Sequence, residues 1–101
     1  REEVSLPLAE RGDRDLDAAA NRLTGTVRQD GQLFVGGEPH SEQSITRQIS
    51  ELSDQARSAS ATPEVRIRAD RAASYVHVRK LIEHCAASNV RSLRFAVTQG
   101  P

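Results

Sequence analysis

The chain has 101 residues and a formal net charge of zero, because 14 Lys and Arg balance 14 Asp and Glu. This length allows one small domain, and the balanced charge argues against general electrostatic attraction to nucleic acid or to an anionic membrane. With two Phe, one Tyr and no Trp, the core must be built from aliphatic side chains. No run approaches the roughly 18 apolar residues that are needed to cross a bilayer.

The first part of the chain is acidic and has little apolar patterning. Residues 1–21 carry six acids against three Arg. Such a stretch does not bury enough apolar surface to offset the entropy of ordering it. We therefore expect a flexible linker over residues 1–21 and a folded domain over residues 22–101.

The domain is expected to begin with a β-hairpin. Residues 23–27 alternate apolar or small with polar side chains, which is typical of a half-buried strand, and residues 32–35 form a second short strand. A two-residue turn would divide the apolar side chains between the two faces of the sheet. A three-residue loop with Gly31 in the left-handed conformation instead pairs Val27 with Leu33, so we expect this loop.

Two helices and two further strands are expected after the hairpin. Ser41 is a suitable N-cap, and the following apolar residues fall on one helical stripe. A second helix is capped by Ser74 and ends near Asn89, and strands over residues 65–69 and 92–97 flank it. In the last strand, Leu93, Phe95 and Val97 lie on one face, opposite the face that carries Arg94. The apolar stripe of the first helix consists of Ile45, Ile49, Leu52 and Ala56.

The predicted order is β-β-α-β-α-β, an α+β domain with a small mixed sheet. Every predicted strand has a polar face, so helices on both sides of the sheet would bury arginines without acids to pair them. We therefore expect both helices on one face. The other face is then open and carries an aromatic ring among cations: Thr24, Thr26, Arg28, Phe34, Arg66, Arg68 and Arg94.

The residues do not form a convincing catalytic or metal-binding pattern. Cys85 lies on the inward stripe of the second helix, where a small buried hydrophobe is expected. His77 and His84 are seven residues apart, whereas helical zinc pairs are four apart. Asp70 is expected to accept backbone N–H groups in the loop that follows its strand. We therefore expect no enzyme, no cofactor and no metal site.

Several segments together resemble the periplasmic domain of the ExbD/TolR biopolymer-transport family. Leu6-Pro7 is similar to the Leu-Pro that follows the family's membrane helix, and residues 27–38 resemble its hairpin with a Gly-containing turn. Residues 67–70 and 75–78 resemble its next strand, its loop and the start of its amphipathic helix. Two positions depart from the family pattern, Gly25 within a strand and Asn89 at a helix end.

The resemblance implies a non-catalytic role in a proton-driven motor. Family members carry one membrane helix ahead of this domain and work beside an ExbB/TolQ-like membrane protein. The resemblance therefore implies an inner-membrane anchor before Arg1, a periplasmic domain that dimerises, and transfer of force to a TonB- or TolA-like protein. Some members also contact peptidoglycan. The proton-carrying Asp of the family lies in the membrane helix, so Asp70 does not have that role.

The residues themselves suggest how a partner binds, because edge strands with free backbone groups invite the addition of a partner's strand. The alternative is an RNA- or ligand-binding module that uses the open basic face. One aromatic on that face is fewer than base stacking usually requires, and the isoelectric point is only ≈ 7.0, so we expect no nucleic acid. We predict partner contacts at the last strand and at Phe34, Arg66, Arg68, Tyr75 and Arg94.

Overall fold

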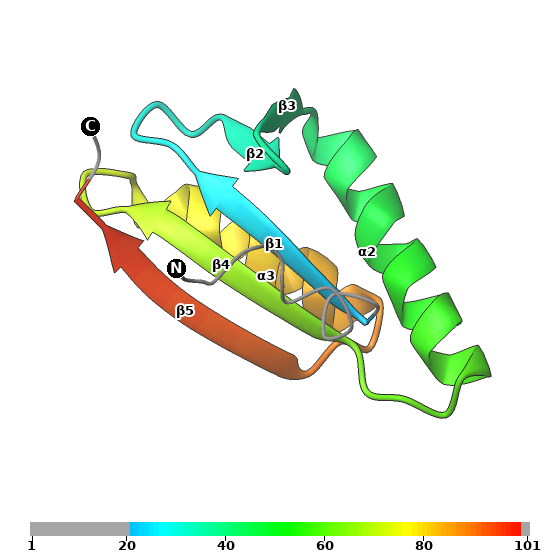
Figure 1. Ribbon diagram of the computed structural model, residues 1–101. Coiled ribbons are helices and arrows are strands. Elements are labelled where there is room, and N and C mark those ends of the chain that lie inside the picture. Colours follow the sequence, from blue (N-terminus) through cyan, green and yellow to red (C-terminus); the bar gives the residue numbers. More distant parts are fainter. Residues whose placement is uncertain (1–20, 100–101) are drawn as a thin grey trace, which may run out of the picture.

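The computed structural model describes residues 21–99, so the predicted linker lies outside the described residues apart from Asn21. The elements are β1 (Arg22–Val27), β2 (Leu33–Val35), β3 (Glu38–His40), α2 (Glu42–Ser58), β4 (Glu64–Asp70), α3 (Tyr75–Ala87) and β5 (Ser92–Thr98). The five strands form one sheet in the order β3-β2-β1-β4-β5 (Figure 1). β1 and β2, and β2 and β3, pair antiparallel, whereas β4 pairs parallel with β1 and with β5. The predicted α+β class and mixed sheet are confirmed.

β3 is the one strand that the sequence did not predict. It has three residues with Pro39 at its centre, opposite Phe34 of β2. Gly36 and Gly37 have φ values of 61° and 81°, so they form the tight turn between the two strands. Proline is tolerated because β3 is an edge strand, where a missing N–H costs no ladder hydrogen bond.

The hairpin has the predicted register. Val27 pairs with Leu33 across a three-residue loop, and Gly31 in this loop has a φ of 90°. Phe34 pairs with Thr26. Because Val27 is buried on the helix side and side chains alternate along a strand, Phe34 lies on the opposite, open face.

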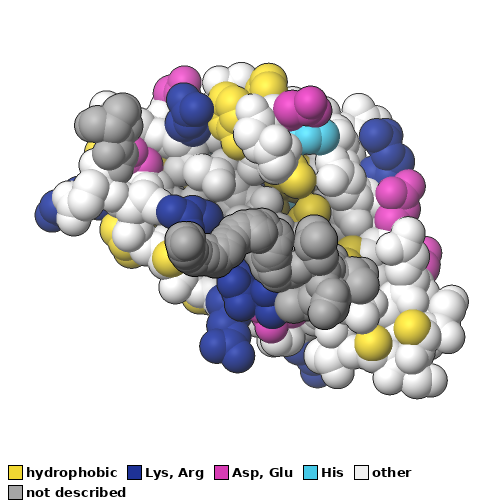
Figure 2. All heavy atoms as spheres, viewed as in Figure 1, with side chains coloured by type: hydrophobic (Ala, Val, Ile, Leu, Met, Phe, Trp, Pro, Cys, Tyr) yellow, Lys and Arg dark blue, Asp and Glu magenta, His cyan; other side chains and the backbone are white. Residues whose placement is uncertain are grey.

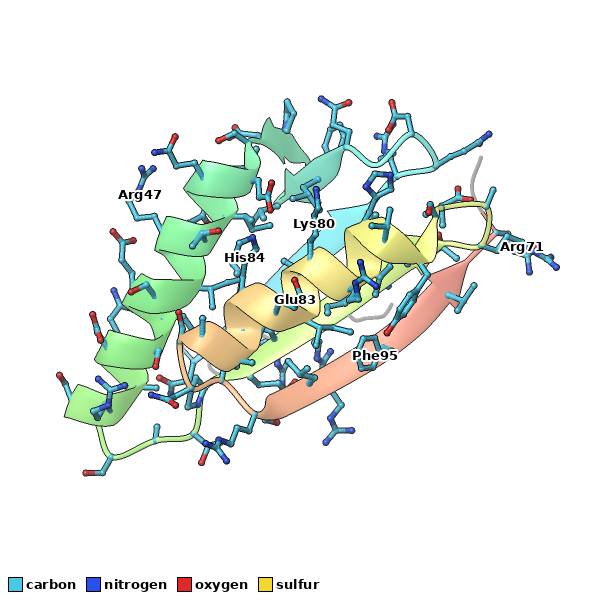
Figure 3. The ribbon with its side chains drawn as sticks, turned by 180° about the vertical axis from the view of Figure 1, so that it is seen from behind. Arg47, Arg71, Lys80, Glu83, His84 and Phe95 are labelled. Atoms are coloured by element: carbon cyan, nitrogen blue, oxygen red, sulfur yellow. The ribbon has the colours of Figure 1, made fainter. Side chains whose placement is uncertain are left out.

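Both helices pack on the same face of the sheet, as predicted (Figure 3). Gly25 of β1 shows this directly, because a methyl group there would lie 3.6 Å from Ile45 Cδ1 of α2 and 3.7 Å from Leu81 Cδ2 of α3. The glycine therefore leaves room for side chains from the two helices to meet above the strand. The buried core consists of Val27, Ile45, Ile49, Leu52, Val65, Ile67, Leu81, Cys85 and Val90.

The ends of the helices follow the sequence signals. The hydroxyl groups of Ser41 and Ser74 accept first-turn backbone N–H groups of α2 and α3 at 3.0 and 3.4 Å. Asn89 follows α3 with a φ of 62°, the left-handed conformation expected at a helix end. The hydroxyl of Ser53 in α2 also donates to the carbonyl oxygen of Ser88, at 2.7 Å, and thereby joins the two helices.

Candidate functional site

β5 forms a long free edge of the sheet. It has seven residues and pairs only with β4 among residues 21–99. The N–H of Arg71 donates to the carbonyl oxygen of Thr98 at 2.9 Å. Because alternate residues of a parallel strand bond to the same neighbouring strand, this bond shows that the even-numbered residues of β5 bond to β4. The outward N–H and C=O groups are therefore those of Leu93, Phe95 and Val97.

The helix side of β5 exposes large apolar side chains. Phe95 pairs with Ile67, and Val97 with Ala69, so both lie on the face that the helices cover. Their exposed fractions are nevertheless 57% and 73%. Figure 3 shows why, since α3 lies over the inner strands and leaves Phe95 on the outermost strand beside it. The predicted face is correct, but the helix does not extend over this strand.

Tyr75 adds a third exposed apolar residue at the same end of the sheet. It is the first residue of α3 and is 65% exposed. The loop that leads to α3 is fixed to the end of β5, because the Arg71 side chain donates to the amide oxygen of Gln99 at 2.9 Å. We call Tyr75, Phe95, Val97 and the free edge of β5 the β5 surface. Phe95 and Val97 are neighbours on one face of the strand, and adjacent apolar exposure of this kind marks sites of interaction with other molecules.

The opposite face of β4 and β5 is basic. Arg66 and Arg94 are directly paired across the two strands, and both are exposed, as is Arg68. Among residues 21–99, the acid that pairs with this face is Glu64, whose Oε2 lies 2.9 Å from Arg66 Nε and 3.1 Å from Arg22 Nε. Figure 2 views this face and shows Lys and Arg side chains gathered toward its lower middle.

Glu64 already forms ion pairs with two arginines, Arg22 and Arg66. The hydrogen bond from Arg66 lowers the pKa of Glu64, and the charges of Arg22 and Arg94 act in the same direction. Within residues 21–99, no carboxylate forms an ion pair with Arg68 or Arg94. The described part of this face therefore has an excess of positive charge beside β5.

Phe34 lies on this open face but away from β5, with β1 and β4 between them. The guanidinium carbon of Arg28 is 4.1 Å from the centre of the Phe34 ring, a cation–π contact. One face of the ring is therefore occupied by Arg28. Of the predicted contact residues, Arg66, Arg68 and Arg94 lie together, Phe34 lies across the sheet, and Tyr75 lies on the helix side.

Cys85 and Asp70 lie as the sequence predicted. Cys85 is fully buried, and burial raises the pKa of its thiol to about 11. A carboxylate oxygen of Asp70 accepts the backbone N–H of Ala72 at 2.8 Å in the loop before α3.

Over residues 21–99, no cluster of His, Cys, Asp and Glu has the arrangement of a metal site. No helix in that part of the chain has the length and apolar character needed to cross a membrane.

All three histidines of the chain, His40, His77 and His84, line one cavity of about 160 Å³, together with Glu42 and Lys80. The sequence predicted only that His77 and His84 lie on the same helix, seven residues apart. His40 joins them because it ends β3, the strand that the sequence did not predict. Its Nδ1 lies 3.0 Å from Ser44 Oγ and from Gln48 Nε2, which fixes the ring against α2.

The comparison with known families agrees with this fold. The family described as "Biopolymer transport protein ExbD/TolR" matches residues 1–100. A search of curated proteins finds no match to the chain. Because the family match spans almost the whole sequence, it confirms the resemblance seen in the hairpin, the loop after β4 and the second helix. The chain belongs to the ExbD/TolR family of biopolymer transport proteins.

Proposed function

We propose that this domain transmits force in a transport complex driven by the proton motive force. In this proposal the domain lies in the periplasm, and a membrane helix outside the present sequence anchors it to the inner membrane beside an ExbB/TolQ-like protein. Membership of a biopolymer-transport family supports the proposal. The domain works by binding, with no catalytic step of its own.

The observation that carries the proposal is the β5 surface. A domain that passes force to another protein needs a place where that protein is held firmly. β5 offers outward backbone N–H and C=O groups at Leu93, Phe95 and Val97, and the exposed rings and methyl groups beside them supply apolar contact. We propose that an extended segment of a TonB- or TolA-like partner pairs with β5 as an additional strand.

The architecture behind β5 is suited to carrying a load. β5 pairs with β4 over seven positions, and β4 pairs with β1 over six, so the three longest strands form a continuous parallel unit. Both β4 and β1 contribute fully buried residues to the core. A partner strand on β5 is therefore joined through two ladders to the best-packed part of the domain.

The family resemblance supplies the remaining proposals. We propose that the domain dimerises, through an interface that leaves β5 free for the partner. Contact with peptidoglycan is a further proposal of the same origin. Neither rests on a surface described above.

Site-directed cross-linking tests the partner site. Cysteine replaces Val97 at the β5 surface, or Arg47 on α2 as a matched exposed control, in the full-length protein in cells. We expect Val97→Cys to form disulfide cross-links with cysteines placed along the periplasmic segment of the partner, and Arg47→Cys to form none. Cross-links from Arg47→Cys without any from Val97→Cys would place the partner on the helices and overturn the proposal.

A further inference from the structure

The two sides of β5 have different chemistry. Phe95 and Val97 point to the helix side and are exposed. Arg94 points to the open side, where Arg66 is its direct neighbour on β4 and Arg68 lies one position further along the same face. The strand is therefore apolar on one side and cationic on the other.

A strand that pairs with β5 must place its own side chains alternately on these two sides. Side chains on the helix side then meet Phe95 and Val97. Those on the open side lie next to Ser92, Arg94 and Ala96. The one opposite Arg94 is at the distance where opposite charges on neighbouring strands attract and like charges repel. Successive residues of the partner strand therefore meet the apolar and the cationic side of β5 in turn, and this alternation restricts which partner sequences fit.

We propose that β5 selects a partner segment in which apolar residues alternate with Asp or Glu. The inference rests on the proposed function and names the chemistry of the partner at that same site. Glu64 supports it, because this acid already binds Arg22 and Arg66 and leaves Arg94 and Arg68 without a carboxylate among the described residues. The exposed apolar side supports it equally, since a wholly acidic segment would leave Phe95 and Val97 uncovered.

A second copy of the chain fits this edge less well. Antiparallel pairing of two β5 strands would match the apolar sides of both copies. It would also bring the arginines of both copies onto one continuous face, where like charges on neighbouring strands repel. Charge complementarity therefore favours an acidic partner strand over self-pairing.

The test compares synthetic peptides of equal length added to the isotope-labelled 101-residue chain. One peptide alternates Val with Glu, a second alternates Val with Lys, and a third has the composition of the first with its Val and Glu in separate blocks. Amide chemical shifts report where each peptide binds, and titration gives its affinity. We expect the Val–Glu peptide to shift the amides of Leu93, Phe95 and Val97 and to bind at least tenfold more tightly than the Val–Lys or blocked peptide at low salt. Added salt should reduce that preference.

Two matched variants locate the charge effect. Arg94→Gln should reduce the preference for Glu over Lys by up to about fivefold, the size of one cross-strand charge pair. Arg47→Gln, which removes the same charge from α2, should leave the preference unchanged. An equal effect of both variants would mean that the preference comes from overall charge, and would overturn the proposal.

The remaining outcomes separate this inference from the proposed function. Equal binding of the Glu and Lys peptides at the β5 amides would overturn the charge requirement and leave edge addition intact. No shift of β5 amides with any peptide would overturn both. Concentration-dependent broadening of the β5 amides without peptide, together with a dimer in sedimentation, would assign the edge to a second copy and overturn the proposal.

Discussion

His84 Nε2 lies 2.8 Å from Glu42 Oε2 and so joins the last turn of α3 to the first turn of α2. The two residues are 42 positions apart in the sequence. Glu42 also lies at the helix end that favours its negative charge, because a helix N-terminus stabilises anions. The contact therefore supports the relative placement of the two helices above the sheet.

The His84–Glu42 contact makes stability depend on pH. The hydrogen bond from His84 lowers the pKa of Glu42 from the usual 4.5. A carboxyl group whose pKa is lower in the folded state stabilises the fold above its unfolded pKa, and this contribution is lost as the pH falls through the folded pKa. We expect Glu42→Gln to lower the free energy of unfolding at pH 6, with the difference from the parent shrinking below pH 4.5.

Urea denaturation at several pH values measures this difference. Glu51→Gln on the same helix is the control, because Glu51 forms no ion pair within residues 21–99. A difference between Glu42→Gln and the parent that stays constant from pH 6 to pH 3.5 would contradict the assignment.

Two glycines that look alike in the sequence should respond oppositely to alanine. Gly31 has a φ of 90°, and a methyl group there would lie 2.6 Å from the ring of His77. A left-handed conformation costs a non-glycine residue about 1–2 kcal/mol, so Gly31→Ala should lower the free energy of unfolding by at least this amount. Thermal or urea denaturation measures the loss, and a Gly31→Ala variant as stable as the parent would show that the loop adopts another conformation.

Gly25→Ala is the comparison. The added methyl group would lie at ordinary contact distances from Ile45 and Leu81, and the backbone at Gly25 is not left-handed. Alanine restricts the unfolded chain more than glycine does, so we expect stability to be unchanged or raised by up to about 1 kcal/mol. The same denaturation series checks this, and a clear loss would mean that the two helices pack closer to β1 than described.

Phe34→Ala should lower the free energy of unfolding less than the truncation of a fully buried side chain does. The ring is half-buried and its main described partner is Arg28, so we expect a loss of about 1 kcal/mol, close to the value of a cation–π contact. Ile67→Ala, in the fully buried core, should lose about 2–5 kcal/mol. Because β1 and β4 separate Phe34 from β5, Phe34→Ala should leave peptide binding at β5 unchanged, and a loss of that binding would extend the partner site across the open face.

Cys85 should be inert in the folded protein. Its thiol is fully buried, and burial raises its pKa to about 11, so the reactive thiolate is scarce at pH 8. We expect labelling by a thiol reagent at the rate of unfolding, with full reaction in denaturant. A second thiol at Val97→Cys should react at once. Rapid labelling of Cys85 in the parent under native conditions would contradict the described packing of α3.

Much of the fold follows from the sequence because its signals are local. The pairing of Val27 with Leu33 is fixed by the alternation of apolar residues and by Gly31, and the ends of both helices are marked by Ser41, Ser74 and Asn89. β3 was not predicted, because proline is disfavoured in strands. Pro39 is acceptable here because β3 lies at an edge of the sheet.

The candidate site was only partly predictable for a different reason. Alternation correctly placed Phe95 and Val97 on the helix side of the sheet. Their exposure depends on where α3 lies across the sheet, which is a tertiary property that no local pattern encodes. The grouping of His40 with His77 and His84 was not predictable for the same reason, because it follows from the packing of β3 against α2.

Pro39 has one more consequence. A sheet that accepts strands at both edges is able to grow without limit, as in a fibril. Within residues 21–99, one border of the sheet is closed by a short strand with proline at its centre, and the other border, β5, is receptive. Two copies joined through β5 would therefore present only proline-containing borders, so sheet growth between copies of this domain would end at a pair.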